Sequence, residues 1–164
     1  MTSGDAPVLL AFLDAQRRRA LEIVDGLDEH QLRTAVLPSG WTPLGLIEHL
    51  GRAERHWFQE VALGTADPLP WPEGDEPQGP FVSDRSAEAV LAFYRATVDT
   101  ANRVLRSAAL STPPRGTHGF NDELIVDVRF IVLHMIEETA RHLGHLDAAR
   151  ELIDGRVGLG QDDL

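Results

Sequence analysis

The stretch of sequence that decides the fold is Leu133-His-Met-Ile-Glu-Glu-Thr-Ala-Arg-His-Leu-Gly-His-Leu-Asp147. It lies inside a longer segment, about 126–154, in which apolar residues recur at the three- and four-residue spacing of an amphipathic helix. Gly155 follows this segment, and glycine commonly stands just past the end of a helix. The apolar residues that predict the buried face of this long helix are Ile131, Met135, Leu146, Ala149 and Ile153.

Three other segments show the same helical periodicity, and no strand alternation competes with them. They span about 6–27, about 43–63, and a third segment that begins near residue 86 and ends before residue 113. The proline-rich segment 64–85 predicts a long crossover between the second and third helices. Because 164 residues suit one domain, we predict an all-α fold, a four-helix bundle formed by residues 1–164.

Polar residues before two of these helices signal where each helix begins. Thr42 precedes Pro43, which suits the first turn, and Ser83, Asp84 and Ser86 are cap candidates for the third helix. The buried face of the second helix is predicted from apolar residues that fall within an arc of about 80° around the helix axis. They are Leu46, Leu50, Ala53, Trp57 and Val61.

The composition argues against several classes of partner. With 15 basic and 26 acidic residues, the formal net charge is −11, which repels nucleic-acid phosphates and anionic membranes. The one basic cluster, Arg17-Arg18-Arg19, fans around a helix and is interpreted as solvated surface. The first residues lack the basic region of a signal peptide, and no apolar run approaches a membrane span, so we expect a cytoplasmic protein.

Glu138 and His142 are four residues apart and therefore lie on one face of the long helix. Both fall within about 50° of the centre of its apolar stripe, whereas Glu137 points to the polar side. A carboxylate directed into an apolar core is destabilising unless it is paired, hydrogen-bonded or bound to a metal ion. Glu138 therefore needs a partner.

His49 supplies a third candidate ligand from the second helix, where it lies at the edge of the apolar stripe. Two imidazoles and one carboxylate suit Zn²⁺, Ni²⁺ or Fe²⁺ with positions left open for water or substrate. The spacing is equally compatible with an i,i+4 Glu–His pair and an unrelated histidine on a helix flank. The residues alone leave both interpretations open.

The remaining histidines and tryptophans receive secondary roles. His134 and His145 flank the ligand line, where they could hydrogen-bond to a ligand or replace one. His56 and Glu60 are interpreted as partly exposed polar residues and Trp57 as core. The residues without an assigned role are His30 and His118, which fall in expected loops, and Trp41 and Trp71.

Several kinds of chemistry lack the residues they need. The chain has no cysteine, no His-Glu-x-x-His, no Gly-x-Ser-x-Gly and no paired Glu-x-x-His motifs. A thiolate nucleophile of its own is therefore excluded, and any thiol chemistry needs a thiol from outside. Metal-assisted chemistry is the remaining route.

Two segments resemble the signature segments of DinB-like proteins. They are Gly40-Trp-Thr-Pro-Leu-Gly-Leu-Ile-Glu-His-Leu50 and Arg129-Phe-Ile-Val-Leu-His-Met-Ile-Glu-Glu-Thr-Ala-Arg-His-Leu-Gly-His-Leu-Asp147. Within that superfamily the chain most resembles a largely uncharacterised, often actinobacterial branch with a glutamate in place of the middle histidine of the metal triad. This branch is related to the metal-binding domain of mycothiol-dependent maleylpyruvate isomerase, and we expect this protein to lack the additional C-terminal domain of that isomerase.

The resemblance implies an up-down-down-up bundle, frequently dimeric, whose metal ligands correspond here to His49, Glu138 and His142. Zinc is the expected metal, with nickel or iron as alternatives, and a thiol such as mycothiol is the expected cosubstrate. The implied activity is transfer of that thiol to a small electrophilic substrate, with His134 or His145 orienting a ligand or relaying a proton. The alternative is a non-catalytic metal- or ligand-binding bundle with a stress-related or regulatory role.

Overall fold

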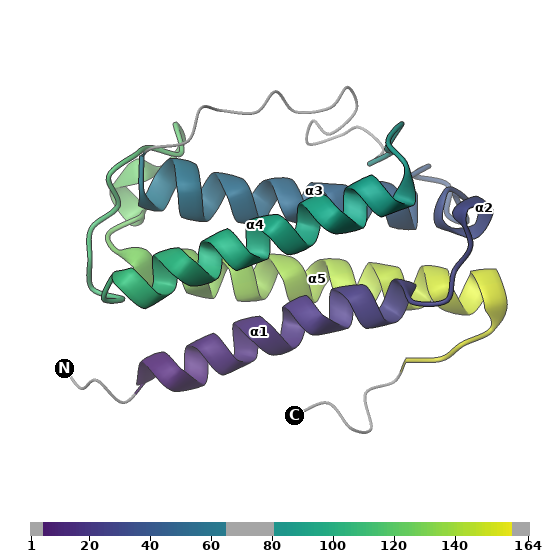
Figure 1. Ribbon diagram of the computed structural model, residues 1–164, viewed down its shortest axis with the longest axis horizontal. Helices are drawn as coiled ribbons and strands as arrows, with labels where there is room; N and C mark the ends of the chain where they lie inside the picture. Colours follow the sequence, from purple (N-terminus) through teal and green to yellow (C-terminus); the bar gives the residue numbers. More distant parts are fainter. Residues whose placement is uncertain (1–4, 65–80, 159–164) are drawn as a thin grey trace.

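The computed structural model describes residues 5–64 and 81–158, and every regular element in these ranges is helical (Figure 1). Most of the predicted crossover 64–85 lies outside the described residues, and so does Trp71. None of the described helices is both long and apolar enough to cross a membrane. The elements in chain order are α1 (Asp5–Val24), α2 (Glu29–Leu32), α3 (Pro43–Arg55), the π-helix η1 (His56–Ala62), α4 (Ala87–Ser107), the 3₁₀ turn η2 (Asp122–Leu124) and α5 (Val128–Asp154).

The four long helices form the predicted up-down-down-up bundle. In Figure 1, α1 and α5 run in one direction, whereas α3 and α4 run in the other. α1 packs chiefly on α5 and α3 chiefly on α4, and α3 also contacts α5. The all-α prediction is therefore confirmed, and the α3–α5 contact is the one that joins the two ligand-bearing segments.

The predicted helix caps are largely confirmed. The side chains of Thr42 and Ser86 accept hydrogen bonds from the N–H groups of Gly45 and Ala89, at 3.1 and 3.2 Å. Gly155 ends α5 in the left-handed conformation, with φ of 82°. Helix α1 ends three residues earlier than predicted, and the short helix α2 with its Asp28 capping box follows it.

The prediction of one α-helix over 43–63 is wrong in type for its last part, because η1 is a π-helix. The loop after α4 is bonded to the end of this segment. The N–H groups of Arg115 and Gly116 donate to the carbonyls of Ala62 and Val61, at 3.2 and 2.9 Å. These bonds satisfy carbonyls that the end of a helix leaves without a partner inside the helix.

The core divides into two apolar clusters along the bundle axis. One contains Leu13 of α1 and Met135 of α5, and the other contains Ala20 and Leu143 of the same helices. All five predicted buried residues of the second helix are buried, including Trp57. Polar side chains lie where the two clusters meet: Arg17, His49, Glu54, Glu138 and His142.

The interpretation of Arg17 as solvated surface is wrong. Arg17 is only 3% exposed, and its guanidinium makes two hydrogen bonds of 2.7 Å to Glu54 on α3, which is 1% exposed. It also donates to Asn102 at 2.8 Å and lies over the ring of Phe58. A charged side chain can be buried when an opposite charge with matching geometry faces it, and Arg17 therefore belongs to the interior.

Candidate metal centre

Two helices bring His49, Glu138 and His142 together at the α3–α5 contact. The Nε2 atoms of His49 and His142 each lie 3.0 Å from the same oxygen, Oε1 of Glu138. One ligand atom from each residue lies within 4.8 Å of the others. The side chains of His49 and His142 are 12% and 11% exposed, and that of Glu138 is 24% exposed, so solvent reaches the group from the carboxylate side.

The positions of these side chains follow from local helix geometry. Glu138 and His142 are one turn apart on α5, so their side chains meet without any help from the rest of the fold. His49 reaches them because α3 contacts α5 and the edge of the apolar stripe of α3 faces that helix. The structure thus excludes an unrelated flank histidine, the alternative that spacing alone left open.

Phe81 covers one side of His49. The two rings are stacked, with centroids 4.2 Å apart. The backbone carbonyl of Phe81 accepts from the N–H of Thr42 at 2.9 Å, and a Cβ atom at Gly45 would lie only 2.2 Å from that carbonyl oxygen. The absence of a side chain at Gly45 therefore allows Phe81 to approach α3 and pack on the His49 ring.

The charge state of the group is set by the shared carboxylate. Hydrogen bonds from His142 and His49 hold the pKa of Glu138 well below its ordinary range, against the opposing effect of burial. Glu138 is therefore negatively charged at neutral pH. Glu137, the neighbouring residue, is exposed as predicted.

His134 and His145 lie on opposite sides of the candidate ligands along α5. His145 is exposed, with its ring 5.7 Å from that of His142 and 6.1 Å from that of Trp41. His134 packs on Trp57, at 4.4 Å between centroids. In the described part of the chain Nδ1 of His142 has no hydrogen-bond partner, so neither histidine bonds to it there.

Sequence reasoning assigned no role to His118, yet the structure places it beside His56 and Trp57. Nδ1 of His118 lies 2.7 Å from Nε2 of His56, and its ring stacks on Trp57 at 4.6 Å. His118 is in a loop, 62 residues from His56, so helical spacing carried no signal of this contact. Glu60, interpreted as partly exposed, bonds to the other nitrogen of His56 at 2.8 Å.

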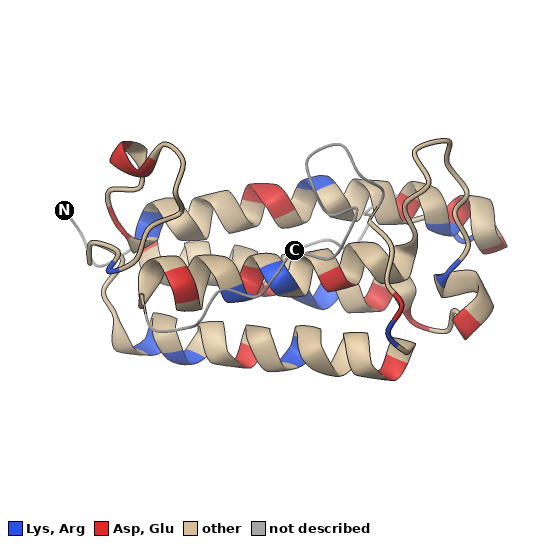
Figure 2. Ribbon diagram, turned by 90° about the horizontal axis from the view of Figure 1, so that it is seen from above, with Lys and Arg blue, Asp and Glu red and all other residues tan. Residues whose placement is uncertain are grey.

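Figure 2 shows acidic and basic residues interspersed along the helices. A family model described as mycothiol-S-transferase matches residues 8–155. The chain belongs to the mycothiol-S-transferase family. This is a DinB-like family, so the resemblance noted in the sequence is confirmed.

One solved structure supports the fold of this mycothiol-S-transferase family member. It is a crystal structure of a conserved protein from Enterococcus faecalis, with 18% sequence identity and a TM-score of 0.72. The match covers 95% of this chain and 100% of that chain. At this identity the similarity concerns the fold alone. No curated protein matches the chain.

Proposed function

We propose that this protein binds one divalent metal ion through His49, Glu138 and His142 and transfers a low-molecular-weight thiol, such as mycothiol, to a small electrophile. The observation that carries the proposal is the convergence of both imidazoles on one carboxylate oxygen, at 3.0 Å each. Membership of the mycothiol-S-transferase family supports the reaction class. The absence of cysteine agrees with a thiol supplied by a cosubstrate.

The three residues fit a metal ion by their chemistry. Nitrogen and oxygen ligands about 2.1 Å from one ion are separated by roughly 3 to 3.5 Å. The Nε2 atoms of His49 and His142 each lie 3.0 Å from Oε1 of Glu138, at the short end of that range. The anionic Glu138 supplies charge that a cation neutralises, and the two imidazoles are suitable for zinc first, and also for nickel or iron. Three protein ligands leave a coordination position open for substrate, as in catalytic rather than structural sites.

A divalent ion held by His49, Glu138 and His142 would lower the pKa of a thiol bound to it, and would so supply a thiolate at neutral pH. The protein's own groups then determine what the sulfur can reach. Glu138 and the two histidines hold the site on two rigid helices, and Phe81 shields one ring from water. The sulfur electron pair forms a bond to the electrophilic carbon, and the displaced electron pair moves to a leaving group or to a neighbouring atom.

The proposal includes a cytoplasmic location, a small-molecule substrate, and assembly as a homodimer of the kind that the family resemblance implies. Sedimentation or light scattering of the purified protein tests the dimer: a mass of twice 18.1 kDa is expected. A mass of one chain would contradict this part of the proposal and leave the site proposal intact.

Elemental mass spectrometry tests the metal site directly. Untagged protein is stripped, equilibrated with limiting zinc or nickel and desalted, and the wild type is compared with Glu138→Ala and His142→Ala. We expect about one ion per wild-type chain and a loss of at least about tenfold in occupancy in both variants, because each removes one of three ligands. Glu137→Ala is the matched control, since Glu137 is adjacent but exposed on the polar side of α5.

Activity separates a transferase from a metal-binding bundle without catalysis. Zinc-loaded protein is mixed with mycothiol and monobromobimane, and the fluorescent thioether is measured against the uncatalysed rate. Faster product formation by the wild type, lost in Glu138→Ala and kept in Glu137→Ala, is the expected result. Bound metal without any acceleration would favour a non-catalytic metal-binding bundle. Absence of metal from folded wild type would refute the metal site and favour a non-catalytic ligand-binding bundle.

A further inference from the structure

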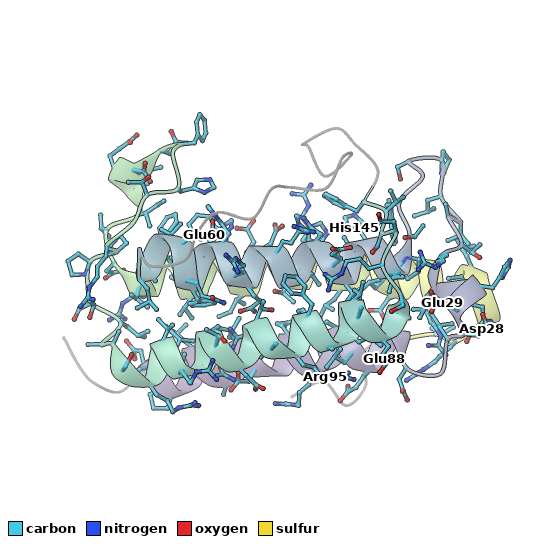
Figure 3. All side chains as sticks on the ribbon, turned by 45° about the horizontal axis from the view of Figure 1, so that its top comes forward. Asp28, Glu29, Glu60, Glu88, Arg95 and His145 are labelled. Carbon is cyan, nitrogen blue, oxygen red and sulfur yellow. The ribbon has the colours of Figure 1, made fainter. Side chains whose placement is uncertain are left out.

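A second group of titratable side chains surrounds Trp57 and has no part in the proposed metal site. Figure 3 labels Glu60, a member of this group, and His145, near the metal ligands; the two lie on the same side of the bundle and apart along its long axis. We name the group the Trp57 cluster. Its members are His56, Trp57, Glu60, His118 and His134.

The fold constructs this cluster from three separate segments. His56, Trp57 and Glu60 come from η1, His134 comes from α5, and His118 comes from the loop after α4. That loop can approach η1 because Gly116 has no side chain: a Cβ atom there would lie 2.0 Å from the carbonyl oxygen of Glu60. Short π-helical segments are found frequently at functional sites.

The backbone and the ring of His118 are both held in place. Its backbone N–H donates to the carboxylate of Asp122 at 2.7 Å, and that of Gly119 donates to the same carboxylate at 3.1 Å. The ring is stacked on Trp57 and bonded to His56. A histidine on an exposed loop therefore has one fixed orientation.

The hydrogen bonds of the cluster have a defined direction. An ionised carboxylate only accepts, so Nδ1–H of His56 donates to Glu60 at 2.8 Å. In neutral His56 the other nitrogen, Nε2, is then an acceptor, and Nδ1–H of His118 donates to it at 2.7 Å. This assignment leaves Nε2 of His118 as the basic atom at the open end of the chain of bonds, where it can gain and lose a proton.

A small substrate is long enough to extend from the candidate metal ligands to the Trp57 cluster. His134 precedes Glu138 by four residues and His56 follows His49 by seven, or about 6 and 10 Å along the helix axes. An electrophilic carbon joined through a conjugated carbonyl spans roughly 4 Å to its oxygen. A hydrogen bond adds about 3 Å, and the bonds from the ion to sulfur and from sulfur to carbon add about 4 Å more. The oxygen can therefore reach groups roughly 10 Å from the ion, which is the distance of the cluster along the helix axes.

We propose that His118, positioned by His56 and Glu60, is the general acid that protonates the electrophile after sulfur has attacked it. The substrates are therefore electrophiles that carry a negative charge once the sulfur has added, such as conjugated ketones. The inference rests on the proposed thiol transfer and adds to it a proton donor and a substrate class. His118 is the catalytic residue, and His56 and Glu60 are positioning residues.

The reaction balances with one proton taken from solvent and one returned. The thiol releases its proton to solvent and attacks as thiolate, so that a carbon–sulfur bond forms. The alkene electron pair then forms the carbon–carbon double bond of the enolate, and the π pair of the carbonyl moves to the carbonyl oxygen. The resulting enolate oxygen takes the proton from Nε2 of His118, and the enol converts to the ketone. His118, which is exposed, recovers a proton from solvent. A halide, in contrast, leaves with its electron pair and needs no proton.

The surroundings of His118 suit an acid of this kind. Partial desolvation by the groups packed against its ring, followed by the neighbouring His56, lowers the pKa of His118 below its ordinary value of 6.5, so its protonated form gives up the proton readily. The charged and titratable groups that face the cluster come from every segment packed against it: Arg55 of α3, His56 and Glu60 of η1, Asp122 of η2, and His134 of α5. The charges of Glu138 and Glu137 act in turn on the pKa of His134.

The test compares two electrophiles with the zinc-loaded protein and mycothiol: methyl vinyl ketone, which needs a proton, and monobromobimane, which does not. For His118→Gln we expect a loss of about 100-fold in transfer to the ketone, the size of a general-acid contribution. Transfer to monobromobimane is expected to change less than about twofold, and metal content is expected to stay at the wild-type level. His30→Gln, an exposed histidine on α2, is the matched control.

The pH profile gives a readout that a purely structural role would not alter. In the wild type, ketone transfer should fall as the pH rises through the pKa of His118, because the protonated ring is the donor. This step should be absent in His118→Gln. In Glu60→Gln it should move to lower pH, because a neutral amide stabilises protonated His56 and His118 less than a carboxylate does.

Nuclear magnetic resonance of the histidine ring nitrogens tests the chain of bonds without any substrate. We expect His56 and His118 both to carry the proton on Nδ1 at neutral pH, and Glu60→Gln to shift both rings. Rings that titrate independently and ignore Glu60→Gln would overturn the inference, as would a second metal ion per chain that is lost in His118→Gln.

The kinetic outcomes distinguish this inference from the proposed function. If the wild type fails to accelerate transfer to either electrophile, the proposed function fails and the inference fails with it. If monobromobimane transfer is accelerated but His118→Gln leaves ketone transfer unchanged, only the proton donor and the substrate class are refuted.

Discussion

Replacing Glu54 by glutamine removes the charge that Arg17 faces in the middle of the bundle while keeping the size of the side chain. Arg17 is 3% exposed and makes both of its 2.7 Å hydrogen bonds to this one carboxylate. Breaking a buried pair in this way leaves an uncompensated charge and typically lowers the free energy of unfolding by about 3–5 kcal/mol. We expect a value near the lower end of that range, because Asp14 and Asn102 remain as partners.

The assay is chemical denaturation followed by circular dichroism, supported by thermal melting, on protein stripped of metal. For a chain of this size a loss of about 3 kcal/mol corresponds to a fall of about 6–12 °C in Tm. Total stabilities of about 5–15 kcal/mol leave the variant folded, so the loss can be measured. Arg18→Ala is the matched control, since Arg18 is exposed beside Arg17 and should change stability by less than about 0.5 kcal/mol.

A double variant separates the loss of a charge partner from the net value of the pair. Arg17→Met with Glu54→Leu replaces both charges by apolar side chains of similar size, and such replacements are often neutral or stabilising. We expect the double variant to be more stable than Glu54→Gln. A loss below about 1 kcal/mol in Glu54→Gln would refute the reasoning, because it would mean that the guanidinium finds other compensation in the interior.

Four further predictions concern backbone contacts and the metal. Gly45→Ala should displace Phe81, whose carbonyl oxygen would lie 2.2 Å from the new Cβ, and should therefore weaken zinc binding in the elemental assay. Gly116→Ala should displace the loop and reduce ketone transfer as His118→Gln does, with monobromobimane transfer kept; equal loss of both would contradict it. Gly144→Ala, with nothing within 4 Å of its Cβ, should stabilise α5 by about 0.5–1 kcal/mol in denaturation curves. A chelator should lower the Tm of zinc-loaded wild type and leave that of Glu138→Ala unchanged, because only a bound ion stabilises the folded state.

The sequence by itself determined the features that depend on neighbouring residues. Helical periodicity identified the four long helices, and local caps such as Thr42 and Gly155 identified where α3 begins and α5 ends. The approach of Glu138 and His142 was predictable for the same reason, since residues four apart on a helix meet whatever else the chain does.

Only the tertiary structure decided the features that depend on contacts between distant segments. Arg17 is buried because Glu54, 37 residues away, faces it, and periodicity along α1 contains no information about that partner. His49 reaches the carboxylate of Glu138 across 89 residues through the crossing of α3 and α5. His118 joins His56 because Gly116 lets a loop pack on η1, whose π-helical form is itself bonded to that loop. Spacing within one helix is set by the backbone alone, whereas the partner of a side chain across the bundle is set by how the whole chain packs.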